Sequence, residues 1–440
     1  MVVETVIDSL TENARFENED QKFWWYATAI SLSRLLAVCK YNEERRHQLL
    51  SWYRRFILPA LGPRPIRGVK PNFEPCLVFD GSACELSMNW KELDPHRTVR
   101  FTIEATGSRA GTSADPFNQD ETTALLRSMS EALPDLDLTQ FEHFAAAFFL
   151  PGDAADDLAA KLPADTPLSQ VWVAFDLLRD HVMAKVYFIP LLKWIHTGTP
   201  TRKLVREAVV QCNSKFGGYD ASFAVLDSFL DSFPPSEAPH IEMVAIDCND
   251  TPSSRVKIYL RTAVNTLTKA REAYTLGGRL CGQDVAAAIE ALDEFWPIIF
   301  RLKGPNSEEK EVFEDGSGCG YAIEMKPGAA EPEVKIHIPV RKIDGSDKQI
   351  CESLSAWFKK RGNMKLATTY KEDLEGVLYV CVPSDEEIGA NWLTAPTTTS
   401  KQAKERTHLF HLLIRNGLEF ICPCTTQPKS SVSMLRMTAG

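Results

Sequence analysis

The stretch Arg255-Val256-Lys257-Ile258-Tyr259-Leu260 decides the fold prediction, because two kinds of side chain alternate along it. In an extended strand successive side chains point to opposite faces, so Arg255, Lys257 and Tyr259 share one face and the aliphatic residues share the other. The same pattern recurs at Lys185-Val186-Tyr187-Phe188 and at Lys335-Ile336-His337-Ile338. We therefore expect three strands that each have one cationic and one apolar face.

The composition is that of a globular protein large enough for one extensive core. The chain has 440 residues, of which 44% are hydrophobic and 25% charged. A net charge of −10 argues against a nucleic-acid surface. The beginning of the chain lacks the pattern of a signal peptide, and no apolar run has the roughly 18 residues of a membrane span, so we expect a soluble, cytoplasmic protein.

Strand pairs alternate with helical segments along the chain. Apolar residues recur at helical spacing through about residues 5–60, and the pattern of strand pair and helices then repeats with a period of roughly 75 residues. We predict strand pairs at 85–90 with 99–104, 171–177 with 183–190, 241–247 with 255–261, 319–325 with 333–340, and 376–382 with 407–424.

Five antiparallel pairs joined by helices predict an α+β fold in which a barrel of about ten strands has helices outside and polar side chains inside. We expect one domain over residues 1–424, with N-terminal helices in 1–60. Residues 425–440 are rich in Ser, Thr and Lys and are expected to form a disordered tail.

Convergence of the polar strand faces brings cations into the lumen of such a barrel. Unpaired buried cations are costly, so we expect an anion there, and a diphosphate suits the planar fork of arginine and the point charge of lysine. The cations expected at one end of the lumen are Arg100, Lys185, Arg255, Lys257 and Lys335.

Two tyrosines on the same strands extend this chemistry. Tyr187 and Tyr259 have hydroxyl donors for the anion, and their ring faces stabilise a carbocation through cation–π attraction. The sequence has no D-D-x-x-D, P-loop or G-x-G-x-x-G motif. We therefore expect side chains to neutralise the diphosphate without a metal ion.

Glu85 has two interpretations at this point. It is either a salt-bridged strand residue or a hydrogen-bond acceptor for an aromatic N–H or O–H, where it raises the nucleophilicity of the ring and takes up a proton. The local sequence leaves both open.

Several segments, taken in order and spacing, resemble the fungal indole prenyltransferases of the dimethylallyltryptophan synthase type. The resemblance runs from about Leu58 to Gly417. It rests on the segments Glu85–Trp90, Arg100, Met183–Phe188, Ser254–Tyr259, Tyr274–Leu280 and Lys335–Pro339.

The resemblance implies a ten-stranded ABBA barrel and metal-independent transfer of a dimethylallyl group from dimethylallyl diphosphate to an aromatic acceptor, usually an indole. It implies no cofactor. Glu85 matches the acid that binds the indole N–H. The resemblance assigns the diphosphate and the shielding of the allylic cation to Arg100, Lys185, Tyr187, Arg255, Lys257, Tyr259, Lys335 and His337.

Five positions depart from the family pattern. Gly417–Pro423 has Glu419 and Pro423 where the family has two tyrosines, and His337 stands where a tyrosine is common. Members that use free tryptophan have an arginine near Glu242, and some have a lysine where Trp172 stands. Trp172, Glu242 and Glu419 are therefore expected in the acceptor pocket.

These departures favour a tryptophan-containing cyclic dipeptide or an indole alkaloid over free tryptophan as the acceptor. Three alternatives remain open: a phenolic acceptor of the tyrosine or xanthone type, a non-catalytic binder of isoprenoid diphosphates, and a scaffold with solvated lysines. The expected partners are small molecules, without nucleic acid or membrane, and the protein is expected to be a monomer or homodimer.

Overall fold

The computed structural model describes residues 4–66, 68–78, 84–89, 97–163, 166–313, 318–339, 343–378, 411–415 and 417–421. The helical start predicted for residues 5–60 is confirmed. Asn18 and Asn42 cap two of its helices, since their side chains accept from the backbone N–H groups of Gln21 and Arg45. The elements are α1 (Glu4–Glu12), α2 (Glu19–Trp24), η1 (Trp25–Ala29), α3 (Ile30–Val38), α4 (Glu43–Trp52), η2 (Tyr53–Ile57) and η3 (Leu58–Leu61).

The first four predicted strand pairs are confirmed, with small shifts at their ends. Each is an antiparallel hairpin. The strands are β1 (Cys84–Asn89), β2 (Val99–Ile103), β3 (Val171–Leu177), β4 (Val182–Phe188), β5 (His240–Asp247), β6 (Val256–Arg261), β7 (Gly320–Met325) and β8 (Glu333–Pro339).

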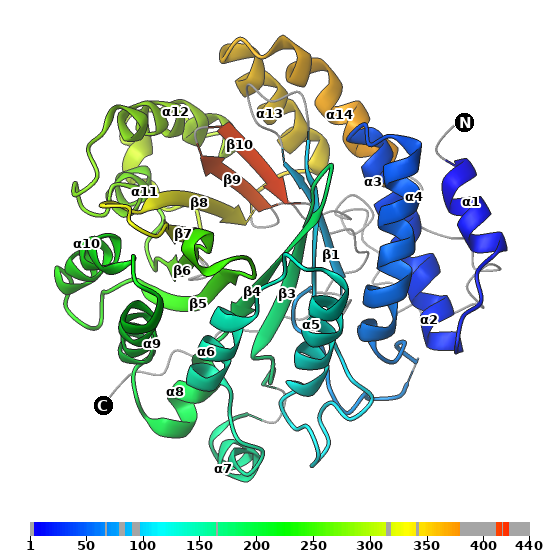
Figure 1. Ribbon diagram of the computed structural model, residues 1–440. Helices are drawn as coiled ribbons and strands as arrows, with labels where there is room; N and C mark the ends of the chain where they lie inside the picture. The colour runs from blue at the N-terminus through cyan, green and yellow to red at the C-terminus, as the bar shows by residue number, and fades with distance from the viewer. Residues whose placement is uncertain are drawn as a thin grey trace.

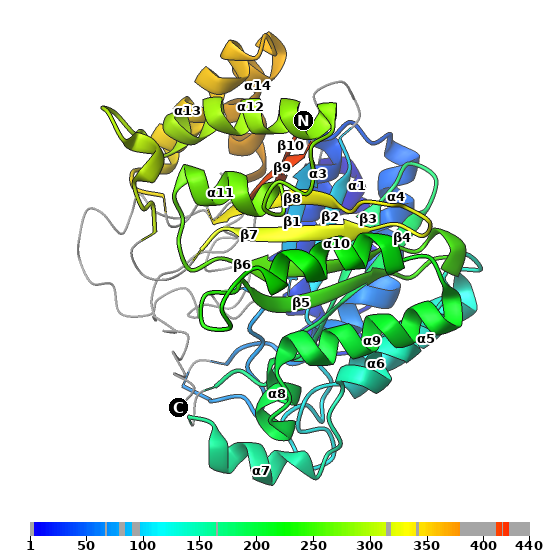
Figure 2. The ribbon, with the colours of Figure 1, turned by 90° about the vertical axis from the view of Figure 1, so that its left-hand side faces the viewer.

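Helices fill the intervals between the hairpins and lie around the sheet (Figures 1 and 2). Among the described residues, every helix is too short or too polar to span a bilayer. The elements are α5 (Asp120–Ala132), α6 (Thr139–Phe148), α7 (Ala154–Lys161), α8 (Leu191–Thr197), α9 (Thr201–Phe216), α10 (Asp220–Asp231), η4 (Thr251–Ser253), α11 (Leu267–Tyr274), α12 (Gln283–Ile299), η5 (Ser307–Glu309), α13 (Asp347–Lys360) and α14 (Met364–Leu378).

The fifth predicted strand pair was misplaced. The start of its first strand is helical and belongs to α14, on which Leu366 and Tyr370 are buried one helical turn apart. Its second strand contains two strands, β9 (His411–Arg415) and β10 (Gly417–Ile421). Residues 379–410 and the predicted tail 425–440 lie outside the described residues, and the single domain over 1–424 stays a prediction.

The sheet is antiparallel and curled, as predicted for an α+β protein. Strands β1 to β8 pair with their neighbours in chain order, β9 pairs with β8, and β10 pairs with both β9 and β1. The strand order is that of a closed barrel, β1-β10-β9-β8-β7-β6-β5-β4-β3-β2.

The apolar face of the sheet packs against the helices. The ring of Trp52 on α4 lies 5.2 Å from that of Phe175 on β3 and 6.2 Å from that of Phe101 on β2. On the next hairpin, Phe141 of α6 stacks on Phe188 of β4 at 6.0 Å. Each such burial is worth about 1.5–3 kcal/mol, so the helices stabilise the outside of the sheet and leave its polar face directed inward.

Candidate active site

Asp176 on β3 joins two cations of the inner sheet face. Arg100 Nε on β2 lies 3.1 Å from Asp176 Oδ1, and Lys185 Nζ on β4 donates to Asp176 Oδ2. The side chain of Lys185 is only 8% exposed. The neighbouring strands β2, β3 and β4 thus form one buried cation–carboxylate–cation unit.

The same arrangement continues around the sheet through Asp247 on β5 and Glu324 on β7. Lys257 Nζ on β6 is 3.4 Å from Asp247 Oδ1 and 3.9 Å from Glu324 Oε2. Arg255 also pairs with both carboxylates, and its Nη1 lies 3.1 Å from Glu324 Oε1. Lys335 Nζ on β8 lies 2.5 Å from Glu324 Oε2. The structure therefore brings the five predicted cations together in two neighbouring sets of ion pairs, and the Cα of Lys185 in the first set lies opposite that of Asp247 in the second.

We call these two neighbouring sets together the charged belt. Among the described residues it contains five cations and three carboxylates. Its members are Arg100, Asp176, Lys185, Asp247, Arg255, Lys257, Glu324 and Lys335.

Strand register produces the belt. The Cα atoms of Arg100, Lys185 and Lys257 lie opposite those of the three carboxylate residues, Asp176, Asp247 and Glu324, on the next strand. Directly opposed residues of unlike charge stabilise an antiparallel pair. The belt is therefore built into the pairing of the sheet.

The three carboxylates correct the sequence-based expectation of unpaired cations. Each lies within a hairpin in which an alanine faces the lysine, and the acid follows two residues after that alanine. The acids precede their lysines by 9, 10 and 11 residues. This signal was available from the first strand of each pair, which reads Ala174-Phe175-Asp176, Ala245-Ile246-Asp247 or Ala322-Ile323-Glu324.

Two opposing effects set the pKa values of the belt side chains. Burial disfavours the charged form of each group, and the neighbouring opposite charges favour it. Burial lowers the pKa of Lys185 to about 8, against the attraction of Asp176. Burial alone raises the pKa of each carboxyl, but the neighbouring cations outweigh it, and the pKa values of Asp176, Asp247 and Glu324 are all lowered. The three carboxylates are therefore ionised at neutral pH.

Aromatic rings lie two residues after each belt lysine. The rings of Tyr187 and Tyr259 are 5.7 Å apart, and that of His337 is 5.6 Å from Tyr259. Burial raises the pKa of Tyr187 to about 12, so its hydroxyl keeps its proton. We call these three residues the aromatic row; its faces lie on the same side of the sheet as the belt.

Glu85 lies on β1 with its Cα opposite Thr102 of β2. Its side chain is half-buried, and burial raises its pKa to about 7. Within the described part of the chain it makes no ion pair, and both interpretations of this residue stay open.

A second carboxylate, Glu104, was missed by the sequence analysis. It accepts hydrogen bonds from the backbone N–H groups of Cys76 (2.8 Å) and Leu77 (3.2 Å), from Ser169 Oγ, and from Trp172 Nε1 (3.2 Å). Burial raises the pKa of Glu104 to about 7 against these donors. Glu104 thus fixes the orientation of Trp172, which the sequence analysis expected in the acceptor pocket.

The other two expected pocket residues have different outcomes. Glu242 accepts two hydrogen bonds from Arg261, from Nε at 2.5 Å and Nη2 at 2.8 Å, and so has a cationic partner within the protein. Glu419 lies on β10 with its Cα opposite Asn89, and its side chain lies outside what the structure describes. Its predicted role stays a prediction.

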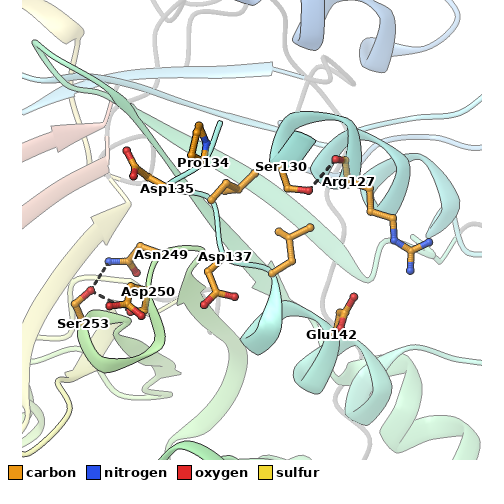
Figure 3. A pocket seen from close by; sticks show the side chains of 11 residues that line it. Arg127, Ser130, Pro134, Asp135, Asp137, Glu142, Asn249, Asp250 and Ser253 are labelled. Atoms are coloured by element: carbon orange, nitrogen blue, oxygen red, sulfur yellow. Dashed lines mark hydrogen bonds between the residues drawn. The ribbon is translucent and has the colours of Figure 1, made fainter. Parts of the chain in front are cut away.

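An open depression of about 710 Å³ lies between the α5–α6 connection and the β5–β6 turn (Figure 3). Its lining includes one cation, Arg127, and four acidic residues, Asp135, Asp137, Glu142 and Asp250, so its net negative charge disfavours a diphosphate. Asn249 Nδ2 donates to Ser253 Oγ within the turn. We therefore assign the candidate donor site to the charged belt. The described residues contain no group of three or more His, Cys, Asp or Glu side chains able to hold a metal ion.

The family model of tryptophan dimethylallyltransferase matches residues 20–373, which include the whole charged belt and the aromatic row. The chain belongs to this family. It is 40% identical over 367 residues to the prenyltransferase iacE of Pestalotiopsis fici, covering 81% of this chain and 83% of that protein. It is 33% identical over 365 residues to the 7-dimethylallyltryptophan synthase of Aspergillus fumigatus, covering 80% and 77%.

Solved structures of the family share the fold. NotF, crystallised in complex with brevianamide F and DMSPP, has a TM-score of 0.78 to this chain at 22% identity. The likeness covers 96% of this chain and 99% of that one. The arrangement of strands and helices is thus that of a known prenyltransferase fold.

Proposed function

We propose that this protein transfers a dimethylallyl group from dimethylallyl diphosphate to an indole. The observation that carries the proposal is the charged belt, in which the described residues place five cations around three carboxylates, beside the aromatic row and on the same sheet as Glu85. A diphosphate ester has on the order of two to three negative charges near neutral pH. Family membership supports the same reaction.

The belt serves the donor. Ionisation breaks the allylic C–O bond, and the diphosphate leaves with the bonding electron pair. Lysine and arginine of the belt stabilise the charge that develops on the leaving oxygen through charge-assisted hydrogen bonds. We infer that this requires no metal ion, because Arg100, Lys185, Arg255, Lys257 and Lys335 supply the compensating charge.

The aromatic row serves the allylic cation. The faces of Tyr187 and Tyr259 attract a cation and, with His337, keep water from it. Both tyrosines remain neutral, since burial raises their pKa values. A neutral ring has no phenolate to be alkylated in place of the acceptor.

Glu85 serves the acceptor. Its carboxylate accepts a hydrogen bond from the indole N–H, which makes the ring more nucleophilic towards the cation. A ring atom forms the new bond to the allyl group, and the carboxylate of Glu85 takes up the proton that the ring loses, which restores the aromatic system. With a pKa of about 7, Glu85 exists in both protonation states at neutral pH.

The acceptor pocket includes Trp172, whose ring stacks on an aromatic substrate. Glu242 and Arg261 neutralise each other, so this part of the site favours an uncharged group over the carboxylate of free tryptophan. We infer that a tryptophan-containing cyclic dipeptide or an indole alkaloid is the acceptor. The ten-stranded barrel closed by β9 and β10 is proposed to exclude water from the site.

Incubation with dimethylallyl diphosphate and a panel of indoles, cyclic dipeptides, free tryptophan and phenols, in the presence of EDTA, tests the proposal. We expect mass spectrometry to detect an indole product heavier by one C5H8 unit. A product from phenols alone contradicts the acceptor class, and activity abolished by EDTA contradicts metal independence. Donor binding without any product contradicts the catalytic assignment.

A further inference from the structure

The proposed donor site contains three carboxylates, Asp176, Asp247 and Glu324, and a negative charge does not itself hold a diphosphate. Asp247 and Glu324 each contact two or more cations, and their side chains are 1% and 0% exposed. Their ionised form repels a diphosphate that approaches the same lysines. Their position in three successive hairpins, always two residues after an alanine that faces the lysine, indicates a shared function.

The belt cations need these carboxylates whenever no anion is bound. Without them five cations would lie together under partial burial, and buried charges are stable only when paired. With a diphosphate bound, phosphate oxygens replace the carboxylates as hydrogen-bond acceptors for the same nitrogens. Donor affinity is then the difference between two sets of ion pairs, and each carboxylate reduces it.

We infer that Asp176, Asp247 and Glu324 are exchangeable counter-ions that hold the belt cations when no diphosphate is bound and speed the departure of diphosphate after transfer. This inference rests on the proposed function, because it requires the belt to bind diphosphate. Inorganic diphosphate is more negatively charged than the donor, so the repulsion acts more strongly on the product than on the substrate. The carboxylates are positioning residues: they hold the belt cations in place between one turnover and the next.

Isothermal titration with inorganic diphosphate tests this role directly. Asp247→Asn and Glu324→Gln remove one negative charge each and keep the shape of the side chain. At an effective dielectric constant of about 20, loss of one repulsive charge a few ångströms from the ligand predicts roughly tenfold tighter binding or more. Asp227→Asn is the matched control, since Asp227 pairs with Arg202 and Arg206 outside the belt; its Kd for diphosphate should equal that of the unaltered protein.

For a variant at Asn89 we expect the opposite change in affinity for diphosphate. Asn89 occupies on β1 the place that the acids occupy on the first strand of each later hairpin, and its Oδ1 accepts from the backbone N–H of Thr98 at 2.6 Å. Asn89→Asp keeps that acceptor oxygen and adds a fourth carboxylate to the register. We expect several-fold weaker diphosphate binding.

Measurements of thermal unfolding test the counter-ion role even if replacement of a belt carboxylate destabilises the protein. Diphosphate should raise the Tm of Asp247→Asn by more than it raises that of the unaltered protein, because the ligand replaces the missing counter-ion. Steady-state rates should be lower in this variant and more sensitive to added diphosphate. If the unaltered protein binds no diphosphate, the proposed function fails; if it binds diphosphate while both acid variants bind it equally or less tightly, the counter-ion role alone is overturned.

Discussion

The first hairpin of the sheet, β1–β2, has the same antiparallel pairing as the next three hairpins, but its side chains differ from theirs. In the later hairpins an alanine faces each lysine, whereas Ser87 faces Arg100 in the first. Thr102 stands where the later hairpins have Tyr187, Tyr259 or His337. Glu85, opposite Thr102, takes the place of Trp172, Met243 and Gly320.

We propose that one structural unit serves two kinds of chemistry. The three later hairpins repeat a cation, a carboxylate and an aromatic ring, which suits a diphosphate and an allylic cation. The first hairpin keeps the cation but replaces the ring with the smaller Thr102 and introduces Glu85. We infer that the acceptor occupies the space that this smaller side chain leaves, next to Glu85, which we propose binds it.

Glu85→Gln should have the largest effect. The amide retains the size of the side chain but loses the charged acceptor and the proton-accepting capacity, so we expect kcat to fall by about 10²–10⁴. Donor affinity should change little, because Glu85 is not part of the belt. Glu207→Gln on α9, whose side chain is 54% exposed, is the control and should retain full activity. If Glu85→Gln also lost affinity for the donor, the assignment of acceptor and donor to different hairpins would be contradicted.

Lys257→Ala tests whether the later hairpins bind the donor. It removes a charge-assisted hydrogen bond to diphosphate and leaves Asp247 and Glu324 with one cation fewer, so donor affinity should fall by roughly 10–100-fold. Lys203→Ala, at a position 67% exposed on α9, is the matched control. Equal donor affinity in Lys257→Ala and the control would exclude the belt as the donor site.

The pH dependence of stability tests the burial of Glu85. Its pKa in the folded protein is raised to about 7 from 4.5, so its stabilising contribution is complete below pH 4.5 and is lost as the pH rises through 7. Allowing for partial exposure, the difference corresponds to about 2 kcal/mol. In urea titrations Glu85→Gln should gain stability relative to the unaltered protein between pH 5 and pH 8. A constant difference across this range would show that Glu85 is solvated.

Thr102→Tyr should have the smallest effect and would make the first hairpin resemble the others. The larger ring fills the space opposite Glu85, so we expect the KM for the acceptor to rise by about tenfold, in line with a lost pocket contact. Donor affinity serves as the internal control and should be unchanged. An unaltered acceptor KM would place the acceptor elsewhere in the lumen.

Much of this arrangement was predictable from sequence because it depends on period-two alternation. The pattern of Lys257, Ile258 and Tyr259 fixed which side chains share a face, and its recurrence predicted that the cations converge. The belt carboxylates do not follow from the alternation of cations alone, because they lie on the first strand of each hairpin and the lysines lie on the second. Asp247 had been treated as part of a strand and not as the partner that its register makes it.

Other features depend on contacts between segments distant in sequence. Glu104 binds the backbone of residues 76 and 77 and the ring of Trp172, and no local pattern indicates such a set of partners. The pairing of Glu242 with Arg261 crosses the β5–β6 hairpin beside an irregularity in its register, which simple alternation does not predict. Local pattern also failed at α14, where a helical run was taken for the start of a strand.

Titration of a non-reactive thiolodiphosphate analogue of the donor into the unaltered protein, Lys257→Ala and Glu85→Gln tests the central claim most directly. The account predicts equal affinity for the unaltered protein and Glu85→Gln, and at least tenfold weaker binding for Lys257→Ala. Equal binding by all three proteins, or an equal loss in both variants, would contradict the assignment of donor and acceptor to different hairpins of one sheet.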